Sequence, residues 1–146
     1  MNNIKSILAT KGANVITIKP DQTIRDALAT LAQHNVGALV VIDSANRPVG
    51  IISERDIVRL AAKNENLFSL KINEVMTTNL ILGVPQDELR AVANIMTEKR
   101  IRHLPIVDNQ GKLIGIISIG DIVKAERNHF EGEADTLRTQ ILADTA

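Results

Sequence analysis

The nonapeptide Gly50-Ile51-Ile52-Ser53-Glu54-Arg55-Asp56-Ile57-Val58 occurs a second time, 65 residues later, as Gly115-Ile116-Ile117-Ser118-Ile119-Gly120-Asp121-Ile122-Val123. The same offset relates further residues upstream, namely Pro20 to Pro85, Arg25 to Arg90, Leu39 to Leu104 and Asp43 to Asp108. An internal repeat of this length indicates two copies of one supersecondary unit. We therefore expect two similar units related by a pseudo-two-fold axis.

The apolar pattern of each copy predicts the order strand, helix, strand, strand, helix. In the first copy the β-branched residues 15–18 favour a strand, and Thr23 with Asp26 has the spacing of a helix cap. The uninterrupted apolar run at 38–42 is typical of a strand covered on both faces. The expected elements are strands at 15–18, 38–42, 49–53, 80–82, 104–107 and 113–118, and helices at 23–35, 54–62, 89–96 and 121–127.

Five segments follow from this pattern. We expect an N-terminal arm at 1–10, a first unit at 11–66, a linker at 67–75, a second unit at 76–127 and a C-terminal tail or helix at 128–146. The fold class predicted is α+β, with two β-α-β-β-α units.

Composition excludes several classes of function. The formal net charge is zero and the aromatics are two phenylalanines, which argues against nucleic-acid binding. The chain has no cysteine, and its three histidines lack metal-ligand spacing. No apolar run is long enough to span a bilayer and the N-terminus lacks a signal-peptide pattern, so we expect a cytoplasmic protein. No nucleophile is paired with a base, and we expect neither catalytic residues nor an enzyme.

The Ser-x-x-Asp motif within the repeat has two interpretations. Ser53 with Asp56, and Ser118 with Asp121, have capping-box spacing at a strand-to-helix junction. Alternatively, a carboxylate at this place accepts hydrogen bonds from both vicinal hydroxyls of a ribose. The adjoining helix N-terminus offers free N–H groups to a phosphate.

The repeated Gly-apolar-apolar-Ser-x-x-Asp-apolar motif resembles that of a tandem pair of CBS domains, often called a Bateman module. The segments Val36–Asp43 and Ile101–Asp108 support the likeness, which extends from about Lys11 to Lys124. The resemblance implies a stand-alone, bacterial-type regulatory protein. It also implies that the two units pack sheet to sheet and leave two clefts for adenine-containing ligands.

By this resemblance each carboxylate faces residues of the other unit. The first cleft is expected to contain Lys11, Gly12, Asn14, Ile16, Val36, Gly37, Ala38, Arg102, Ile116, Ser118 and Asp121. The second cleft is expected to contain Ile51, Ser53, Arg55, Asp56, Thr78, Asn79, Ile81, Ile101, His103 and again Arg102. The clefts differ in charge because Arg55 corresponds to Gly120 and Arg102 to Gly37. Both arginines are candidate phosphate ligands, since a guanidinium presents a planar fork of donors.

The expected function is therefore a non-catalytic sensor of an adenine nucleotide: AMP, ADP, ATP or an NAD-like ligand, with AMP preferred. No cofactor or metal is required. We expect a homodimer that acts on a separate client protein, with neither nucleic acid nor membrane as partner. Two alternatives stay open at this point: a binder of S-adenosylmethionine, and a purely structural dimerisation module without a ligand.

Overall fold

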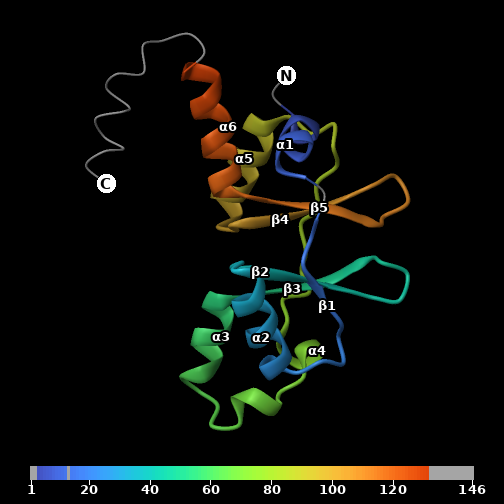
Figure 1. Ribbon diagram of the computed structural model, residues 1–146, viewed down its shortest axis with the longest axis vertical. Helices are drawn as coiled ribbons and strands as arrows, with labels where there is room; N and C mark the ends of the chain where they lie inside the picture. The colour runs from blue at the N-terminus through green and yellow to red at the C-terminus, as the bar shows by residue number, and fades with distance from the viewer. Residues whose placement is uncertain (1–2, 13, 132–146) are drawn as a thin grey trace, which may run out of the picture.

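Two small sheets face each other at the centre of the computed structural model, which describes residues 3–12 and 14–131 (Figure 1). The first sheet has the order β1-β2-β3, and the second pairs β4 with β5. The strands are β1 (Thr17–Ile18), β2 (Ala38–Ile42), β3 (Pro48–Ser53), β4 (His103–Val107) and β5 (Leu113–Ser118). The α+β architecture of two packed units is thus confirmed.

Helices cover the outer side of each sheet (Figure 1). They are α1 (Ile4–Lys11), α2 (Ile24–His34), α3 (Glu54–Ala61), the 3-10 helix η1 (Leu67–Ser69), α4 (Ile72–Val75), α5 (Leu89–Lys99) and α6 (Ile119–Glu131). The predicted cap of α2 is confirmed, because the Thr23 side chain accepts from the Asp26 N–H and the Asp26 carboxylate accepts from the Thr23 N–H. Most of the expected tail, residues 132–146, lies outside the described residues.

The two hairpins have the same register. Leu39 pairs with Ile52 in the first sheet, and Leu104 pairs with Ile117 in the second. Each ladder also shifts by one residue at the equivalent place, after Val41 and after Ile106. This agreement supports the pseudo-two-fold relation that the repeat predicts.

The strand predicted at 80–82 is wrong, and the one predicted at 15–18 is shorter than expected. In the first unit β1 pairs in parallel with β2, whereas the second unit keeps only an isolated bridge between Gly83 and Ile106. The position equivalent to Val40 is Pro105, which has no N–H to donate to a neighbouring strand. The next rung of this parallel ladder therefore does not form.

The helix that precedes each unit in the chain packs in the core of the opposite unit. Ile4 and Ile7 of α1 lie in the core of the second unit, with Leu104 and Ile117. Leu67 and Ile72, from the segment expected to be a linker, lie in the core of the first unit. Figure 1 shows this exchange: the blue α1 lies beside β5 and α6, and α4 lies with the unit of β1 to β3.

The exchanged helices revise the alignment of the repeat. The Ile4 N–H donates to the Asp87 carbonyl, and the Ile72 N–H donates to the Gln22 carbonyl, so that Ile72 corresponds to Ile4 with an offset of 68 residues. The side-chain contacts agree with this offset, because Leu8 packs on Gly115 as Met76 packs on Gly50, and an added Cβ at either glycine would force the packed side chain to shift. The offset of 65 residues, which would place Met76 opposite Lys11, therefore does not hold for these helices.

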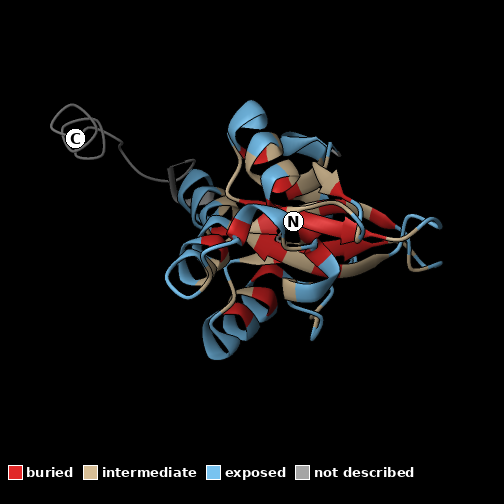
Figure 2. Cartoon of the chain, turned by 90° about the horizontal axis from the view of Figure 1, so that it is seen from below, coloured by how far each residue is buried: buried red, intermediate tan, exposed pale blue. Residues whose placement is uncertain are grey.

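The inner faces of the sheets form the contact between the units. Val40, Ile42 and Leu113 are buried together there, and Figure 2 shows that the buried residues concentrate in the strands. The hairpin tips are also joined, because the Leu113 N–H donates to the Asn46 carbonyl at 2.9 Å. Within the described part of the chain, no helix has the length and apolarity needed to cross a membrane.

We predict that Ile4→Ala lowers the free energy of unfolding by about 2–5 kcal/mol, the usual cost of removing a fully buried isoleucine side chain. Ile4 is fully buried in the core of the second unit. Urea denaturation measures the change. Lys5→Ala, at an exposed position of the same helix, is the matched control and should change stability by at most about 0.5 kcal/mol. Equal effects of the two substitutions would contradict the assignment of α1 to this core.

Candidate functional site

Both Ser-x-x-Asp motifs form reciprocal caps at the start of a helix. The Ser53 N–H donates to Asp56 Oδ2 at 2.9 Å, and the Asp56 N–H donates to Ser53 Oγ at 3.2 Å. Ser118 and Asp121 repeat the pattern at 2.8 and 3.1 Å. The capping interpretation is confirmed for both motifs. It leaves the Oδ1 atoms of Asp56 and Asp121 without a hydrogen bond from the described residues, and thus available to a ligand.

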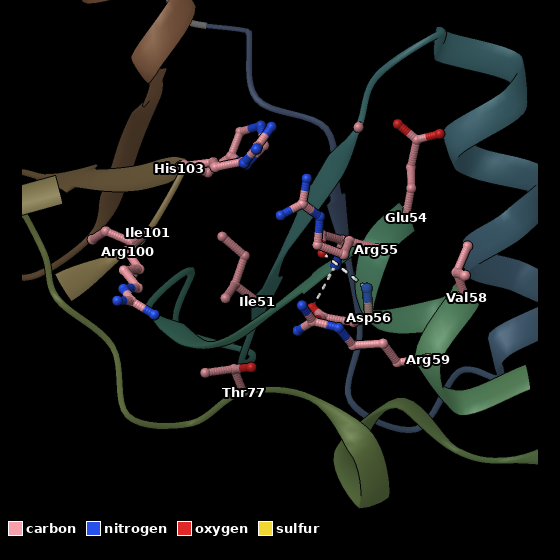
Figure 3. A pocket seen from close by; sticks show the side chains of 13 residues that line it. Ile51, Glu54, Arg55, Asp56, Val58, Arg59, Thr77, Arg100, Ile101 and His103 are labelled. Carbon is pink, nitrogen blue, oxygen red and sulfur yellow. Dashed lines mark hydrogen bonds between the residues drawn. The ribbon is translucent and has the colours of Figure 1, made fainter. Parts of the chain in front are cut away.

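A cavity of about 860 Å³ opens beside Asp56, between α3 of the first unit and the residues that lead into β4 of the second. Figure 3 shows arginines on both sides of it, with Ile51 between them. Its lining residues are Gly37, Ile51, Ser53, Glu54, Arg55, Asp56, Val58, Arg59, Thr77, Arg100, Ile101, Arg102 and His103. Both units contribute, so the cavity depends on how the sheets pack. We call it the second cleft.

Four arginines line this cleft. Arg55 and Arg59 lie one turn apart on α3, which puts both beside Asp56. Arg100 ends α5 in a left-handed conformation with φ of 56°, and Arg102 follows on the way into β4. None of the four forms an ion pair with a described side chain. The cleft therefore contains four arginines and two carboxylates, those of Asp56 and Glu54, and has an excess of positive charge.

Only part of this lining is predicted from the sequence. The lining residues not predicted are Glu54, Val58, Arg59, Thr77 and Arg100. Helical spacing from Asp56 offered a signal for Arg59, and the neighbouring Ile101 offered one for Arg100.

The lining of this cavity differs from the set of residues that the resemblance implied. Gly37, expected at the first cleft, lines the second, where the absence of a side chain leaves room for the Glu54 carboxylate. Thr78, Asn79 and Ile81, expected at the second cleft, do not line its cavity.

The first cleft contains the only ion pair among the described side chains. Lys11 Nζ lies 2.6 Å from Asp121 Oδ2 and donates to the Ile116 carbonyl at 2.8 Å. Lys11, Ile116, Ser118 and Asp121 are thus brought together as expected. Gly12, Asn14, Ile16, Val36 and Ala38, expected in the same cleft, form no described hydrogen bond with Asp121. The carboxylate of this cleft already has a cationic partner.

Burial and neighbouring charges change the pKa of two groups here. Burial acts to raise the pKa of Asp121, but hydrogen bonds from Lys11 and Ser118 lower it below the ordinary 3.8. Ionised Asp121 therefore stabilises the fold above pH 3.8, and this contribution is lost as the pH falls through the lowered pKa. Burial, with Lys11 and Arg102, also lowers the pKa of His103, although Asp121 and Glu54 oppose this. His103 thus interacts with charges of both clefts.

The described residues contain no group of three or more His, Cys, Asp or Glu side chains able to hold a metal ion. What the second cleft offers instead is a carboxylate oxygen, a wall of apolar atoms from Ile51 and Ile101, and several guanidinium groups. This combination suits a ligand that has hydroxyl donors, a flat apolar part and an anionic part.

Comparison with known proteins gives consistent matches. The family model for the CBS domain matches residues 4–63 and 72–128. The CBS domain-containing protein YhcV of Bacillus subtilis is 35% identical over 93% of this chain and 94% of its own length. A CBS-domain protein of Agrobacterium tumefaciens is similar in structure, with a TM-score of 0.80 and 38% identity over 85% of this chain and 98% of its own. The CBS domain pair of protein MJ0100, solved with 5′-methylthioadenosine and S-adenosyl-L-methionine, has a TM-score of 0.76 and 30% identity over 90% of this chain and 98% of its own.

We predict that the Asp121 carboxyl titrates below pH 3.8 and that Lys11→Met raises its pKa, because the substitution removes a cation 2.6 Å away while burial persists. Carbon-detected NMR of the side-chain carboxyl against pH measures both midpoints. Lys5→Met removes an equal charge from an exposed position of the same helix and should leave the midpoint unchanged. An unchanged midpoint in Lys11→Met would show that the ion pair does not form in solution.

Proposed function

The chain belongs to the CBS-domain family and carries two copies of the domain, and we propose that this pair is a regulatory module that binds an adenine nucleotide in the second cleft. AMP is the preferred member of this class, as the sequence analysis expects. The observation that carries the proposal is the cavity of about 860 Å³ where Asp56 lies among four arginines.

Asp56 would recognise the ribose. Its Oδ2 is engaged by the Ser53 N–H at 2.9 Å, and this bond fixes the direction of the carboxylate. The remaining oxygen accepts from the vicinal hydroxyls of a ribose. The side chains of Ile51 and Ile101 supply apolar surface for an adenine ring, one from each unit.

The arginines favour a phosphate over other groups attached to adenosine. Guanidinium groups bind phosphate oxygens through paired hydrogen bonds and opposite charge. S-adenosylmethionine has the same adenosine but carries a positively charged sulfur, which would lie near several cations. The solved pair of MJ0100 is named with S-adenosyl-L-methionine and 5′-methylthioadenosine, which supports the adenosine part of the proposal. S-adenosylmethionine is thus the second candidate.

Regulation would follow from the position of the cleft between the units. A ligand that contacts Arg55 and Asp56 on one side, and Arg100 and Ile101 on the other, binds most tightly at one separation of the units. A ligand shifts a conformational equilibrium by its difference in affinity for the two states. The module would pass this shift, without catalysis, to a client protein.

We predict that AMP at about a hundred times its dissociation constant stabilises the protein by roughly 2.7 kcal/mol, and that Asp56→Asn abolishes most of this effect while Asp121→Asn retains it. Asparagine keeps the oxygen that accepts from the capping N–H, so the fold is preserved. Thermal unfolding with AMP, ADP, ATP, NAD, NADP and S-adenosylmethionine measures the shifts. NADP should raise the unfolding temperature less than NAD, because the 2′-phosphate on its ribose would repel the Asp56 carboxylate.

A pair of arginine variants controls for general charge. Arg59→Gln changes a residue that lines the cleft, whereas Arg90→Gln changes an exposed residue that does not line it. Only the former should weaken AMP binding, by about tenfold for the loss of one charged hydrogen bond. Stabilisation by S-adenosylmethionine alone, or by no compound of the panel, would overturn the nucleotide proposal.

We further propose that the module is a homodimer formed through its outer helices. Val58 on α3, which also lines the second cleft, and Val123 on α6 occupy equivalent positions, and these residues are 70% and 56% exposed. Ile95 on the adjacent α5 is 41% exposed. Large apolar side chains exposed at equivalent positions of the two units favour burial against a second copy related by symmetry.

We predict that the wild-type chain sediments as a dimer at micromolar concentration and that Val123→Asp with Ile95→Asp makes it a monomer, since burying two unpaired carboxylates opposes association. Sedimentation equilibrium measures the mass. Leu82→Asp, at a loop residue with 43% exposure, is the matched control and should stay dimeric. A monomeric wild type, or a dimeric double variant, would contradict this interface.

A further inference from the structure

The two clefts differ in the state of their carboxylates. Asp56 Oδ2 accepts one described hydrogen bond, from the Ser53 N–H. Asp121 Oδ2 accepts two, from the Ser118 N–H at 2.8 Å and from Lys11 Nζ at 2.6 Å. The side chains of Lys11 and Asp121 are 35% and 23% exposed, so the ion pair is partly shielded from water. The repeat alone would not suggest this difference, because both motifs are complete.

Lys11 belongs to a part of α1 that has no counterpart in the other unit. Ile4 to Leu8 correspond to Ile72 to Met76 with an offset of 68, whereas the strands repeat with an offset of 65. The helix α1 has eight residues and α4 has four, so residues 8–11 extend α1 beyond the position where α4 ends. Lys11 is the last of them and the last residue of the helix.

The additional lysine replaces a backbone contact. In the first unit the Ile51 carbonyl accepts from the Thr77 N–H at 3.0 Å, and the Ile51 N–H donates to the Thr77 carbonyl. The equivalent carbonyl in the second unit, that of Ile116, accepts from Lys11 Nζ instead. A flexible ammonium group thus takes the place of a fixed peptide at the edge of the first cleft.

The position of Lys11 is fixed by the core. Ile4 and Ile7 are buried, and Leu8 packs on Gly115 of β5. Lys11 lies three residues beyond Leu8, on the same face of α1, which directs its side chain toward β5 and α6. Gly12 then ends the helix with φ of 92°. The ammonium group therefore lies beside Asp121 because the buried residues of α1 fix the helix against the second unit.

We propose that Lys11 determines which cleft is filled first, because it holds the carboxylate that a ribose would need in the first cleft. This inference rests on the proposed nucleotide function. In both clefts the Oδ1 of the aspartate accepts no described hydrogen bond, but the charge of Asp121 is already compensated by Lys11. A nucleotide that enters the first cleft must therefore compete with Lys11 for Asp121, whereas in the second cleft it meets a carboxylate without a cationic partner among the described side chains. The second cleft binds at low ligand concentration, and the first binds only at higher concentration.

Calorimetric titration with AMP and with ATP tests the inference in the full chain. In an Asp56→Asn background only the first cleft keeps its carboxylate, and there Lys11→Met should tighten binding by about fivefold, the upper range for a partly exposed ion pair. Lys11→Arg keeps the cation and should not tighten it. Lys5→Met is the matched control for loss of charge. In an Asp121→Asn background, where binding reports the second cleft, Lys11→Met should have no effect, which restricts the action of Lys11 to the first cleft.

The outcomes separate the two proposals. If neither probe binds the wild type or any variant, the nucleotide function fails and the inference fails with it. If the wild type fills both clefts with equal affinity, or if Lys11→Met leaves the first cleft unchanged, the inference is overturned and the nucleotide function stands. If Lys11→Met weakens nucleotide binding in the first cleft, Lys11 contacts the nucleotide and does not compete with it. This result also overturns the inference.

Discussion

The contact between the inner faces of the two sheets is the interaction on which the rest of the structure depends. Val40, Ile42 and Leu113 are buried in it, and it holds the two hairpins at one separation. The second cleft exists only at this separation, because α3 supplies one side and the residues before β4 supply the other. Burial of apolar surface thus creates a polar cavity that neither unit has by itself.

The exchange of short helices makes the two units difficult to separate from each other. Each unit completes its core with residues that precede the other unit in the chain, Ile4 and Ile7 in one case and Ile72 in the other. Gly50 and Gly115 leave room for it, because an added Cβ at either position would force Met76 or Leu8 to shift. A ligand in a cleft between two units joined in this way acts on the whole chain, as regulation requires.

The two units differ mainly in the charged side chains around their cleft carboxylates. One carboxylate is surrounded by arginines without ion-pair partners among the described side chains, and the other is paired with Lys11. The scaffold residues that set register and caps are the same in both units, so these charges were free to differ without loss of the fold. His103, whose pKa responds to charges of both clefts, lies where the two environments meet.

The sequence by itself determined the two-fold architecture, the order of most elements and both capping motifs, because these depend on periodicity and on contacts three or four residues apart. It did not reveal that the strand predicted at 80–82 is absent. Pro105 cannot donate the N–H that this strand would require, and the pairing of the two segments is visible only in the tertiary structure. It did not include Arg59 and Arg100 in the cleft, nor reveal that Lys11 pairs with Asp121. Those contacts join distant segments, and the length and anchoring of a helix decide them, so only the tertiary structure fixes them.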